Sequence, residues 1–328
     1  MNVCPQFTHL LVLPRLRVQN ANAISSALTH GFPSMTAFLG LMWALERKAV
    51  AAGIDRVAFN AVGVVSHGWQ EQTTEGGFVK SFRLTRNPVE KDGSTAAIVE
   101  EGRIHLDVSL VFALTAEDWD EAQRQTDMTA LAELMSGMRV AGGTVMPPER
   151  ASQQRYQPWL VDLTGDSEDQ QKAFRKTCVR LLPGTALVAR DVLIDQRLQA
   201  LQDDNSSATR LDAWLSLSRI EWHYDDSANN GKGAWQSNRR KGDGWIVPMP
   251  VGYGALSELQ PPGTVRNARD ATTPFRFVES LYSVGEWVGT HRLNSPQQLL
   301  WYADSKPEDG LYRCRNDYRP ADAPVDLL

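Results

Sequence analysis

A polar stretch without acidic residues follows the first apolar segment of the chain. Residues 17–34 read RVQNANAISSALTHGFPS. Its hydrogen-bonding side chains include Gln19, Asn20, Asn22, Ser25 and His30. Histidine is the most frequent general base in proteins, and a nearby serine hydroxyl is a candidate nucleophile. No third group that would orient His30 is evident in the stretch, so a histidine that makes structural or ligand hydrogen bonds is the competing interpretation.

Other chemistry-bearing residues give weaker signals. His105 and Asp107 alternate on one strand face, where they form either a metal or His–carboxylate pair or an ordinary polar surface. The cysteines Cys4, Cys178 and Cys314 are far apart in sequence and match neither a zinc spacing nor a disulfide framework. We therefore expect no metal site and reduced thiols.

Glycine-bearing turns do not form a nucleotide-binding motif. Gly142-Gly143 and Gly252-Tyr253-Gly254 match neither GxxxxGK[ST] nor GxGxxG, so we interpret them as tight turns. Among the ten tryptophans, Trp235 is the candidate for stacking on a base because it lies in a polar segment. We expect no cofactor.

The charged residues are segregated along the chain. The 328 residues carry a net charge of −5, which by itself does not mark a nucleic-acid binder. However, residues 1–45 and 171–190 contain basic residues and no acid, whereas acidic residues collect over 116–133. One basic run is often only a solvated surface. Several acid-poor runs, one of them on a strand, favour a phosphate ligand because arginine presents a planar fork of donors.

Hydrophobic periodicity predicts the elements of the first half. Residues 9–19 alternate as a strand, with the apolar even positions on one face and Arg15 and Arg17 on the other, and Pro14 indicates an edge or a bulge. An amphipathic helix follows the predicted cap Ser34 and ends at Gly53. The further elements are a strand over 57–70, a polar hairpin over about 71–102, a strand over 103–114, a helix over 116–138 and a short strand over 140–146.

This order of elements is that of a ferredoxin-like fold. We therefore expect an α+β domain over residues 1–150, with both helices on one side of the sheet and the other face free for RNA. Prolines near residue 150 mark a boundary, and 151–328 is predicted to be a mixed α/β C-terminal region. There we expect a strand before residue 190, helices over 190–218 and 278–288, a strand over 245–250, and a polar, mobile loop over about 224–244.

Several long motifs resemble one known family. In order, they are LLVLPRLRVQNANAISSALTHGFPS, RLTRNPVEKDGSTAAIVEEGRIHLDVSLVF, MRVAGGTVMP, RLLPGTALVAR, GWIVPMPVGYGALS, GTVRNARDATTPFRFVESLYSVGEW and LLWYAD with GLYR. Together they resemble the RAMP-superfamily subunits that hold the 5′ end of the CRISPR RNA in type I-F (Ypest) surveillance complexes. The resemblance runs from about Leu10 to Arg313, and it is poorest over 1–8, 150–170 and 191–240.

The resemblance implies a fold, a function and partners. The fold is a ferredoxin-like, RRM-like (RAMP) domain with an inserted thumb-like β-hairpin and a further region. The function is that of a non-catalytic RNA-binding subunit that caps the 5′ handle of the crRNA. The implied partners are the large subunit of the complex, the adjacent backbone subunit, and target DNA near the flanking motif. A cytoplasmic protein is expected, because the apolar run Leu10–Leu13 is too short for a membrane span.

Polar residues within the family-like motifs are the candidate RNA contacts. The first group is Arg15, Arg17, Gln19, Asn20, Asn22, Ser25 and His30, and the second group is Arg86, Asn87, Arg139, Arg266, Asn267 and Arg269. Arginine would neutralise phosphates, and amide side chains would read the edges of unpaired bases. Two alternatives remain: a metal-independent RAMP-type endoribonuclease that uses His30 on repeat RNA, and a docking scaffold without direct RNA contact.

Overall fold

The computed structural model describes residues 3–77, 79–86, 89–90, 92–148, 153–239, 243–268 and 270–320, with only the backbone for 85, 86, 229 and 230. The large antiparallel sheet contains β1 (His9–Asn22), β2 (Val57–Glu71), β7 (Arg103–Ala116), β8 (Arg139–Val140), β9 (Gly143–Met146), β10 (Trp159–Asp162), β11 (Thr185–Ala189), β14 (Trp245–Ala255), β15 (Val278–Gly289), β16 (Leu300–Lys306) and β17 (Leu311–Asn316). Three separate hairpins pair β3 (Thr73–Gly76) with β4 (Val79–Phe82), β5 (Leu84–Arg86) with β6 (Ile98–Glu100), and β12 (Trp222–Asp225) with β13 (Ala234–Ser237).

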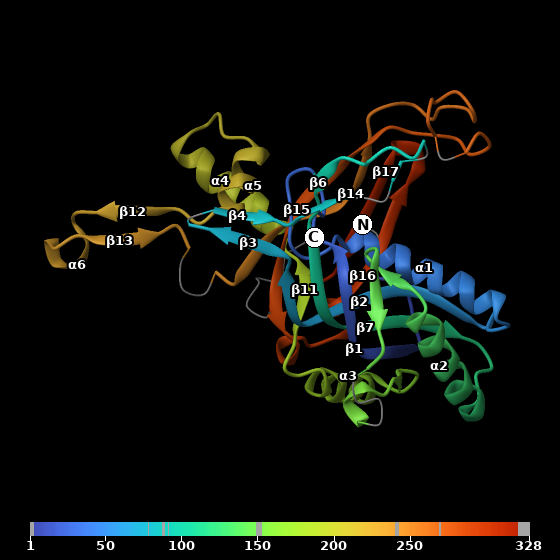
Figure 1. Cartoon of the computed structure of the whole chain (residues 1–328). Coiled ribbons are helices and arrows are strands. Elements are labelled where there is room, and N and C mark those ends of the chain that lie inside the picture. The colour runs from blue at the N-terminus through green and yellow to red at the C-terminus, as the bar shows by residue number, and fades with distance from the viewer. Residues whose placement is uncertain are drawn as a thin grey trace.

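Helices lie on several sides of this sheet, and one short helix lies at the far tip of the β12–β13 hairpin (Figure 1). They are α1 (Met35–Ala51), α2 (Glu121–Ser136), α3 (Ser167–Arg180), α4 (Val192–Asp204), α5 (Arg210–Ser218), α6 (Ala228–Gly231) and α7 (Pro296–Leu299), with 3₁₀ turns η1 (Gln154–Tyr156), η2 (Thr290–Arg292) and η3 (Pro307–Asp309). The predicted α+β class is confirmed. Among the described residues, no helix is both long and apolar enough to cross a membrane.

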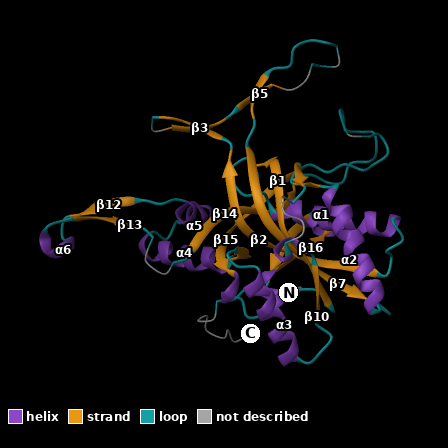
Figure 2. Cartoon of the chain, turned by 60° about the horizontal axis from the view of Figure 1, so that its bottom comes forward, coloured by secondary structure: helices purple, strands orange, loops and turns teal. Residues whose placement is uncertain are grey.

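The predicted elements of the first half are confirmed. Strands pair in the order β2-β7-β1-β9, each antiparallel to its neighbour. The Ser34 side chain accepts a hydrogen bond from the amide of Thr36 and so caps α1. The predicted apolar stripe of α1 is buried, and α1 and α2 pack side by side on one face of the sheet (Figure 2).

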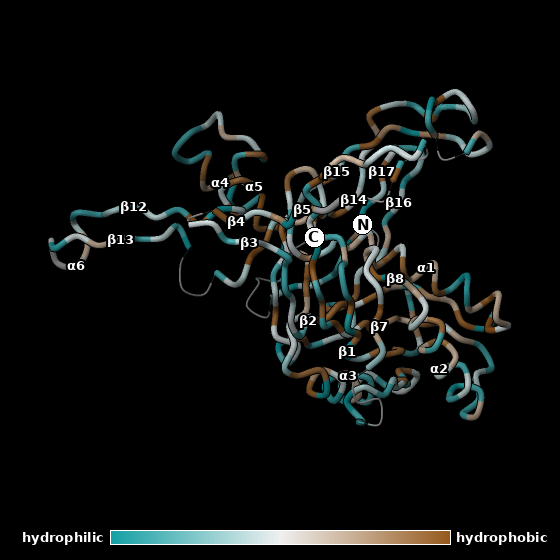
Figure 3. Tube along the Cα trace, in the orientation of Figure 1, coloured by the Kyte–Doolittle hydropathy of each residue, from teal (hydrophilic) through white to brown (hydrophobic). Residues whose placement is uncertain are grey.

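The expectation of a free opposite face is wrong. Leu10 and Val12 of β1 are completely buried on that face, where they cluster with Phe174 and Cys178 of α3 and with Tyr302 of β16. The C-terminal region thus supplies a second hydrophobic core on the face that we expected to be open. Figure 3 shows hydrophobic segments along the strands and helices of this body.

A β-bulge in β1 changes the predicted alternation. The pairing of β1 with β7 shifts register between Leu13 and Leu16, and Arg15 takes a positive φ of 53°. This β-bulge confirms the prediction from Pro14 of an edge or a bulge. It also moves Leu16 and Val18 to the side of α1 and α2, opposite to Leu10. The prediction that all even positions share one face is therefore wrong, although Arg15 and Arg17 do lie opposite Leu16 and Val18.

The second half joins the same sheet. β2 pairs along one edge with both β16 and β11, so the ring β2-β16-β17-β14-β15-β11 closes on itself. Residues 278–288 form β15 rather than the predicted helix. This strand lies between β11 and β14, and residues 283–288 are buried on both of its faces. The sequence therefore lacks the strict alternation of apolar and polar residues that identifies a half-buried strand.

Two polar segments contain hairpins. The insertion over 71–102 holds β3–β4 and β5–β6, with the predicted turn at Asp92-Gly93, where Gly93 has a φ of 82°. The loop predicted over 224–244 is instead largely the β12–β13 hairpin with α6 at its tip. The helical prediction over 190–218 is confirmed as two helices, α4 and α5. The domain boundary at residue 150 stays a prediction.

Candidate nucleic-acid interface

A basic cavity lies on the sheet face that α3 covers. The apolar part of this face, with Leu10 and Val12, changes to polar residues beyond the bulge at Arg15. The cavity there has a volume of about 200 Å³. Its lining consists of Pro14, Arg15, His67, Ser109, Arg155, Arg180, Leu181, Leu182 and Pro183. None of these described lining residues is acidic, so the cavity is suited to an anion.

Hydrogen bonds fix the floor of the cavity. His67 Nδ1 lies 2.7 Å from the carbonyl oxygen of Pro183, so this nitrogen must donate. His67 Nε2 then accepts from the Ser109 hydroxyl at 2.6 Å, and Ser109 Oγ accepts the amide of Arg15 at 3.0 Å. Burial lowers the pKa of His67, and the Pro183 carbonyl partly opposes this effect. The imidazole is therefore neutral at pH 7 and ties β2, β7 and the loop after α3 together.

The three arginines of the cavity are held in different ways. Arg15 Nη1 donates to Asp107 Oδ2 at 3.2 Å, and its side chain is only 11% exposed, so it is largely committed to the fold. Arg180 lies at the end of α3, with its guanidinium 3.6 Å from the centre of the Trp159 ring. Arg155 in η1 is exposed and lies over Tyr156 at 5.1 Å. Arg155 and Arg180 therefore present cations that aromatic rings orient without neutralising them.

The end of β1 brings together several predicted contacts. Gln19, Asn20 and Asn22 are exposed, and Asn20 has a positive φ of 58° at the second register shift. The amide of Asn22 donates to the Ala141 carbonyl at 2.9 Å, which places this strand end beside the turn that follows Arg139. The Asn22 side chain is bonded to both backbone groups of Ile24, whereas Gln19 is exposed.

Arg17 lies nearby on β1. It is half-buried, and it pairs through the backbone with Asp107 of β7 and Met146 of β9.

The structure requires glycine at both positions of the Gly142-Gly143 motif. A Cβ at this position would lie 2.7 Å from the backbone nitrogen of Ala21 and 2.7 Å from Val18 Cγ1. Gly142 has a φ of 79°. The motif therefore serves a tight turn, as the sequence predicts, and also a close packing of strands that the sequence does not predict.

Ser25 and His30 have separate partners. His30 Nδ1 lies 2.9 Å from Glu71 Oε1 and its ring meets Phe82 edge to face at 5.5 Å. The Ser25 hydroxyl lies 2.7 Å from the hydroxyl of Thr29. Glu71 is thus the orienting carboxylate that was not evident in the sequence, because it lies 41 residues away. His105 and Asp107 form no dyad: His105 accepts the amide of Asn20, and Asp107 binds Arg15.

Other predicted contacts lie away from the cavity. Arg266 and Asn267 are exposed on the loop between β14 and β15, at the opposite end of the molecule from α3 (Figure 1). Arg86 lies on β5, where only the backbone is described, and Asn87 and Arg269 lie outside the described residues. The structure therefore groups the β1 candidates and Arg139, and separates them from the β14–β15 loop.

Sequence reasoning missed Arg155, Arg180 and His67 as site residues. Arg180 belongs to the acid-free run 171–190, which was the available signal for it. Arg155 lies where the family resemblance is poor, and His67 is a single histidine in an apolar strand. Their association depends on α3 and η1 covering the sheet, which no local pattern predicts.

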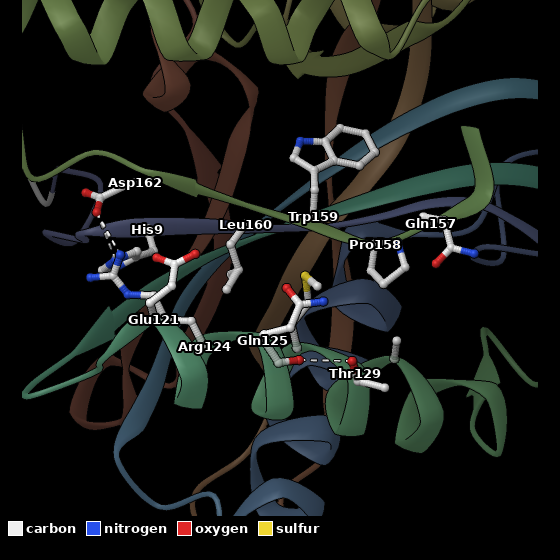
Figure 4. Close-up of a pocket in the computed structure, with 12 residues that line it drawn as sticks. His9, Glu121, Arg124, Gln125, Thr129, Gln157, Pro158, Trp159, Leu160 and Asp162 are labelled. Atoms are coloured by element: carbon white, nitrogen blue, oxygen red, sulfur yellow. Dashed lines mark hydrogen bonds and ion pairs between the residues drawn. The ribbon is translucent and has the colours of Figure 1, made fainter. Parts of the chain in front are cut away.

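A larger cavity, of about 580 Å³, lies between α2 and β10 (Figure 4). Arg124 bridges Asp162 at 2.9 Å there, and Glu121 also lines the cavity. His9 is 2% exposed, and burial lowers its pKa, so it adds no charge at pH 7. One arginine against two carboxylates makes this cavity acidic and unsuited to phosphate. Trp159 points away from it, toward α3.

Comparisons with known proteins establish the family. Residues 11–314 match the model of a family described as CRISPR-associated protein (Cas_Csy2). The CRISPR-associated protein Csy2 of Pseudomonas aeruginosa (strain UCBPP-PA14) is 45% identical to this chain over 311 residues, which cover 93% of the chain and 94% of the relative. The chain therefore belongs to the Csy2 family, the type I-F CRISPR subunits that its motifs resemble.

Proposed function

We propose that this chain is a non-catalytic subunit that binds the 5′ handle of the crRNA in a type I-F surveillance complex. Membership of the Csy2 family implies a role in that complex. The observation that supports direct RNA binding is the cavity under α3, where Arg15, Arg155 and Arg180 meet with no acidic lining residue in the described chain. A volume of about 200 Å³ suits a phosphate with part of its sugar.

Each part of the site has a distinct task in this proposal. Arg155 and Arg180 bind backbone phosphate, and Arg15 shapes the cavity through its ion pair with Asp107. On β1 beyond the bulge, Gln19 and Asn20 are exposed and read the edges of unpaired bases. Affinity then comes from the arginines, and specificity from the amides.

The same proposal assigns the fold and the partners. The strand order β2-β7-β1-β9, with α1 and α2 on one face, supports a ferredoxin-like RAMP domain. The hairpins within 71–102 correspond to its thumb-like insertion. The large subunit would share the handle, the adjacent backbone subunit would contact this chain, and target DNA near the flanking motif would lie beside the pair.

Handle binding is tested on the chain co-purified with the large subunit. Because hydrogen bonds to charged groups contribute about 1.5–3 kcal/mol, Arg155→Ala combined with Arg180→Ala should weaken handle binding roughly tenfold or more. Lys172→Ala is the matched control, because Lys172 is an exposed cation on the same helix, paired with Glu168. Equal affinity of the double variant and the control would contradict the proposed cavity. Failure to co-purify with the large subunit would contradict the proposed partnership.

The His30–Glu71 contact favours one alternative, a RAMP-type endoribonuclease. A carboxylate that orients a histidine is a general-base arrangement, and His30 is 66% exposed. This alternative predicts that the chain cleaves repeat RNA and that His30→Ala abolishes cleavage. Intact repeat RNA after long incubation excludes it. Crosslinks from the guide to this chain would exclude the remaining alternative, a scaffold without RNA contact.

A further inference from the structure

The β12–β13 hairpin carries an exposed aromatic face. Tyr224 pairs directly with Trp235, and Trp222 lies two residues from Tyr224, so the three rings share one face of the ribbon. Their exposed fractions are 63% for Trp222, 51% for Tyr224 and 65% for Trp235. Tyr224 and Trp235 meet at a centroid distance of 5.6 Å. The hairpin extends away from the body in both views (Figures 1 and 2).

Such a ribbon is incomplete by itself. A two-stranded hairpin is at best marginally stable in water unless its face packs against something. Here the opposite face carries polar residues such as His223 and Gln236, and the aromatic face is open. Exposed aromatic clusters of this kind mark binding surfaces. A ligand with flat, apolar surfaces is therefore expected on the side of Trp222 and Trp235.

Another cavity, at the base of the hairpin, is rich in arginine. It has a volume of about 580 Å³ and lies between α4, α5 and the strands β14 and β15. Its charged lining residues are Arg190, Arg197, Arg239, Arg292, Asp243 and Glu286. Four arginines against two carboxylates leave a net charge of +2. The amide of Arg239 donates to Ser237 at 3.1 Å, and Ser237 pairs with Trp222, so the cavity adjoins the hairpin.

The arginines are anchored by only part of their hydrogen-bonding capacity. Arg197 Nε donates to Ser216 at 2.9 Å, and Arg239 donates to the carbonyl of Leu217. Arg190 pairs with Glu286, while its buried Nε has no hydrogen-bond partner within the described part of the chain. A guanidinium has five N–H donors, so each anchor leaves others available. The cavity can therefore orient several donors toward an anion.

Stacking surfaces next to fixed cations are the combination that single-stranded nucleic acid requires. We propose that the aromatic face of β12–β13 and the arginine cavity at its base bind single-stranded nucleic acid, with bases on the rings and phosphates at the arginines. This site shares no described lining residue with the cavity under α3, so it is separate from the proposed handle site. A protein segment would cover the rings too, but it would also have to supply carboxylates to the cavity.

The test uses the full chain and fluorescein-labelled oligothymidylate of about 20 nucleotides, which is longer than the roughly 4–16 nucleotides of one typical binding module. Stacking contributes about 1–3 kcal/mol per base, so Trp235→Ala and Trp222→Ala should each weaken binding about 5- to 150-fold in an anisotropy titration. Arg292→Ala should lower the slope of log K against log salt by roughly 0.7. Trp69→Ala is the matched control, because Trp69 is 49% exposed on β2.

Each outcome has a defined meaning. Recovery of affinity in Trp235→Phe, with unchanged circular dichroism in every variant, would show that a ring rather than the fold is needed. Unchanged oligothymidylate binding in both tryptophan variants would overturn the proposal, as would wild-type chain that does not bind the probe. Loss of a co-purifying subunit with oligothymidylate binding intact would assign the face to a protein instead. Handle-RNA binding should survive Trp235→Ala, which separates this site from the proposed function.

Discussion

His67 Nε2 lies 2.6 Å from Ser109 Oγ and so links β2 to β7 beneath the basic cavity that α3 covers. The other ring nitrogen donates to Pro183, whose loop follows α3. Since Ser109 is fully buried, its hydroxyl proton needs an acceptor inside the protein, and neutral His67 supplies it. The cavity floor therefore depends on the protonation state of one histidine.

This dependence predicts a loss of stability on acidification. Burial lowers the pKa of His67 in the folded chain, whereas an unfolded histidine titrates near about 6.5. The unfolded chain therefore binds more protons, and the stability contributed by neutral His67 is complete above about pH 7 and falls as the pH drops below about 6.5. Urea unfolding at pH 7.5 and at pH 5.5 measures the difference in the free energy of unfolding between the two pH values.

His67→Gln should reduce the difference in the free energy of unfolding between pH 7.5 and pH 5.5. His9→Gln should reduce this difference further, because burial also lowers the pKa of His9. His223→Gln, on the exposed hairpin, is the control. If the free energy of unfolding changes equally between the two pH values in the wild type and in His67→Gln, the assignment of a neutral His67 is refuted.

Gly143→Ala should destabilise the chain by about 1–3 kcal/mol, since the added Cβ would overlap backbone atoms of Ala21 that cannot rotate away. Gly40→Ala is the matched control: it lies on the exposed side of α1 with open space around it, and it should stabilise by about 0.5–1 kcal/mol. Chemical denaturation measures both. An unchanged free energy of unfolding in Gly143→Ala would mean that β9 does not approach β1 as closely as this structure shows.

Arg155→Ala should lower the salt dependence of handle-RNA binding without a loss of stability. Each lost phosphate contact changes the slope of log K against log salt by roughly 0.7 for a single strand. Arg155 is exposed, so its removal leaves the fold intact. Arg15→Ala, by contrast, should lower the free energy of unfolding. The Arg15 side chain is only 11% exposed, and its removal leaves Asp107 without this ion-pair partner. An unchanged slope for Arg155→Ala would remove that residue from the phosphate site.

Asp127→Ala should cost about 2–3 kcal/mol of stability. Asp127 is 5% exposed and accepts hydrogen bonds from Trp119 Nε1 at 2.8 Å and Arg56 Nη1 at 3.0 Å. The cost stays below the roughly 3–5 kcal/mol of a fully buried pair, because the Arg56 side chain is 29% exposed and regains water. Asp120→Ala, which removes the cap of α2, should cost about 1 kcal/mol. Thermal or urea unfolding measures both costs. A larger loss of stability in Asp120→Ala than in Asp127→Ala would contradict the proposed contribution of the Asp127 hydrogen bonds.

Local patterns were enough to predict much of the first half. The stripe of α1, the alternation of β7 and the proline at the β1 bulge report interactions between residues that are close in sequence. The long motifs were enough to identify the family, because their order and length are specific to it. The acid-free run 171–190 also indicated the basic character of α3.

The tertiary structure decided which faces are open and which cations meet. The sequence pattern of 278–288 predicts a helix where β15 lies, because burial on both faces removes the alternation that identifies a strand. The sheet face expected to bind RNA is mostly covered, because Phe174 and Tyr302, which are distant in sequence, pack on Leu10 and Val12. Arg155 and Arg180 meet Arg15 only because η1 and α3 cover that sheet. Contacts between distant segments depend on how the whole chain packs, so no local periodicity encodes them.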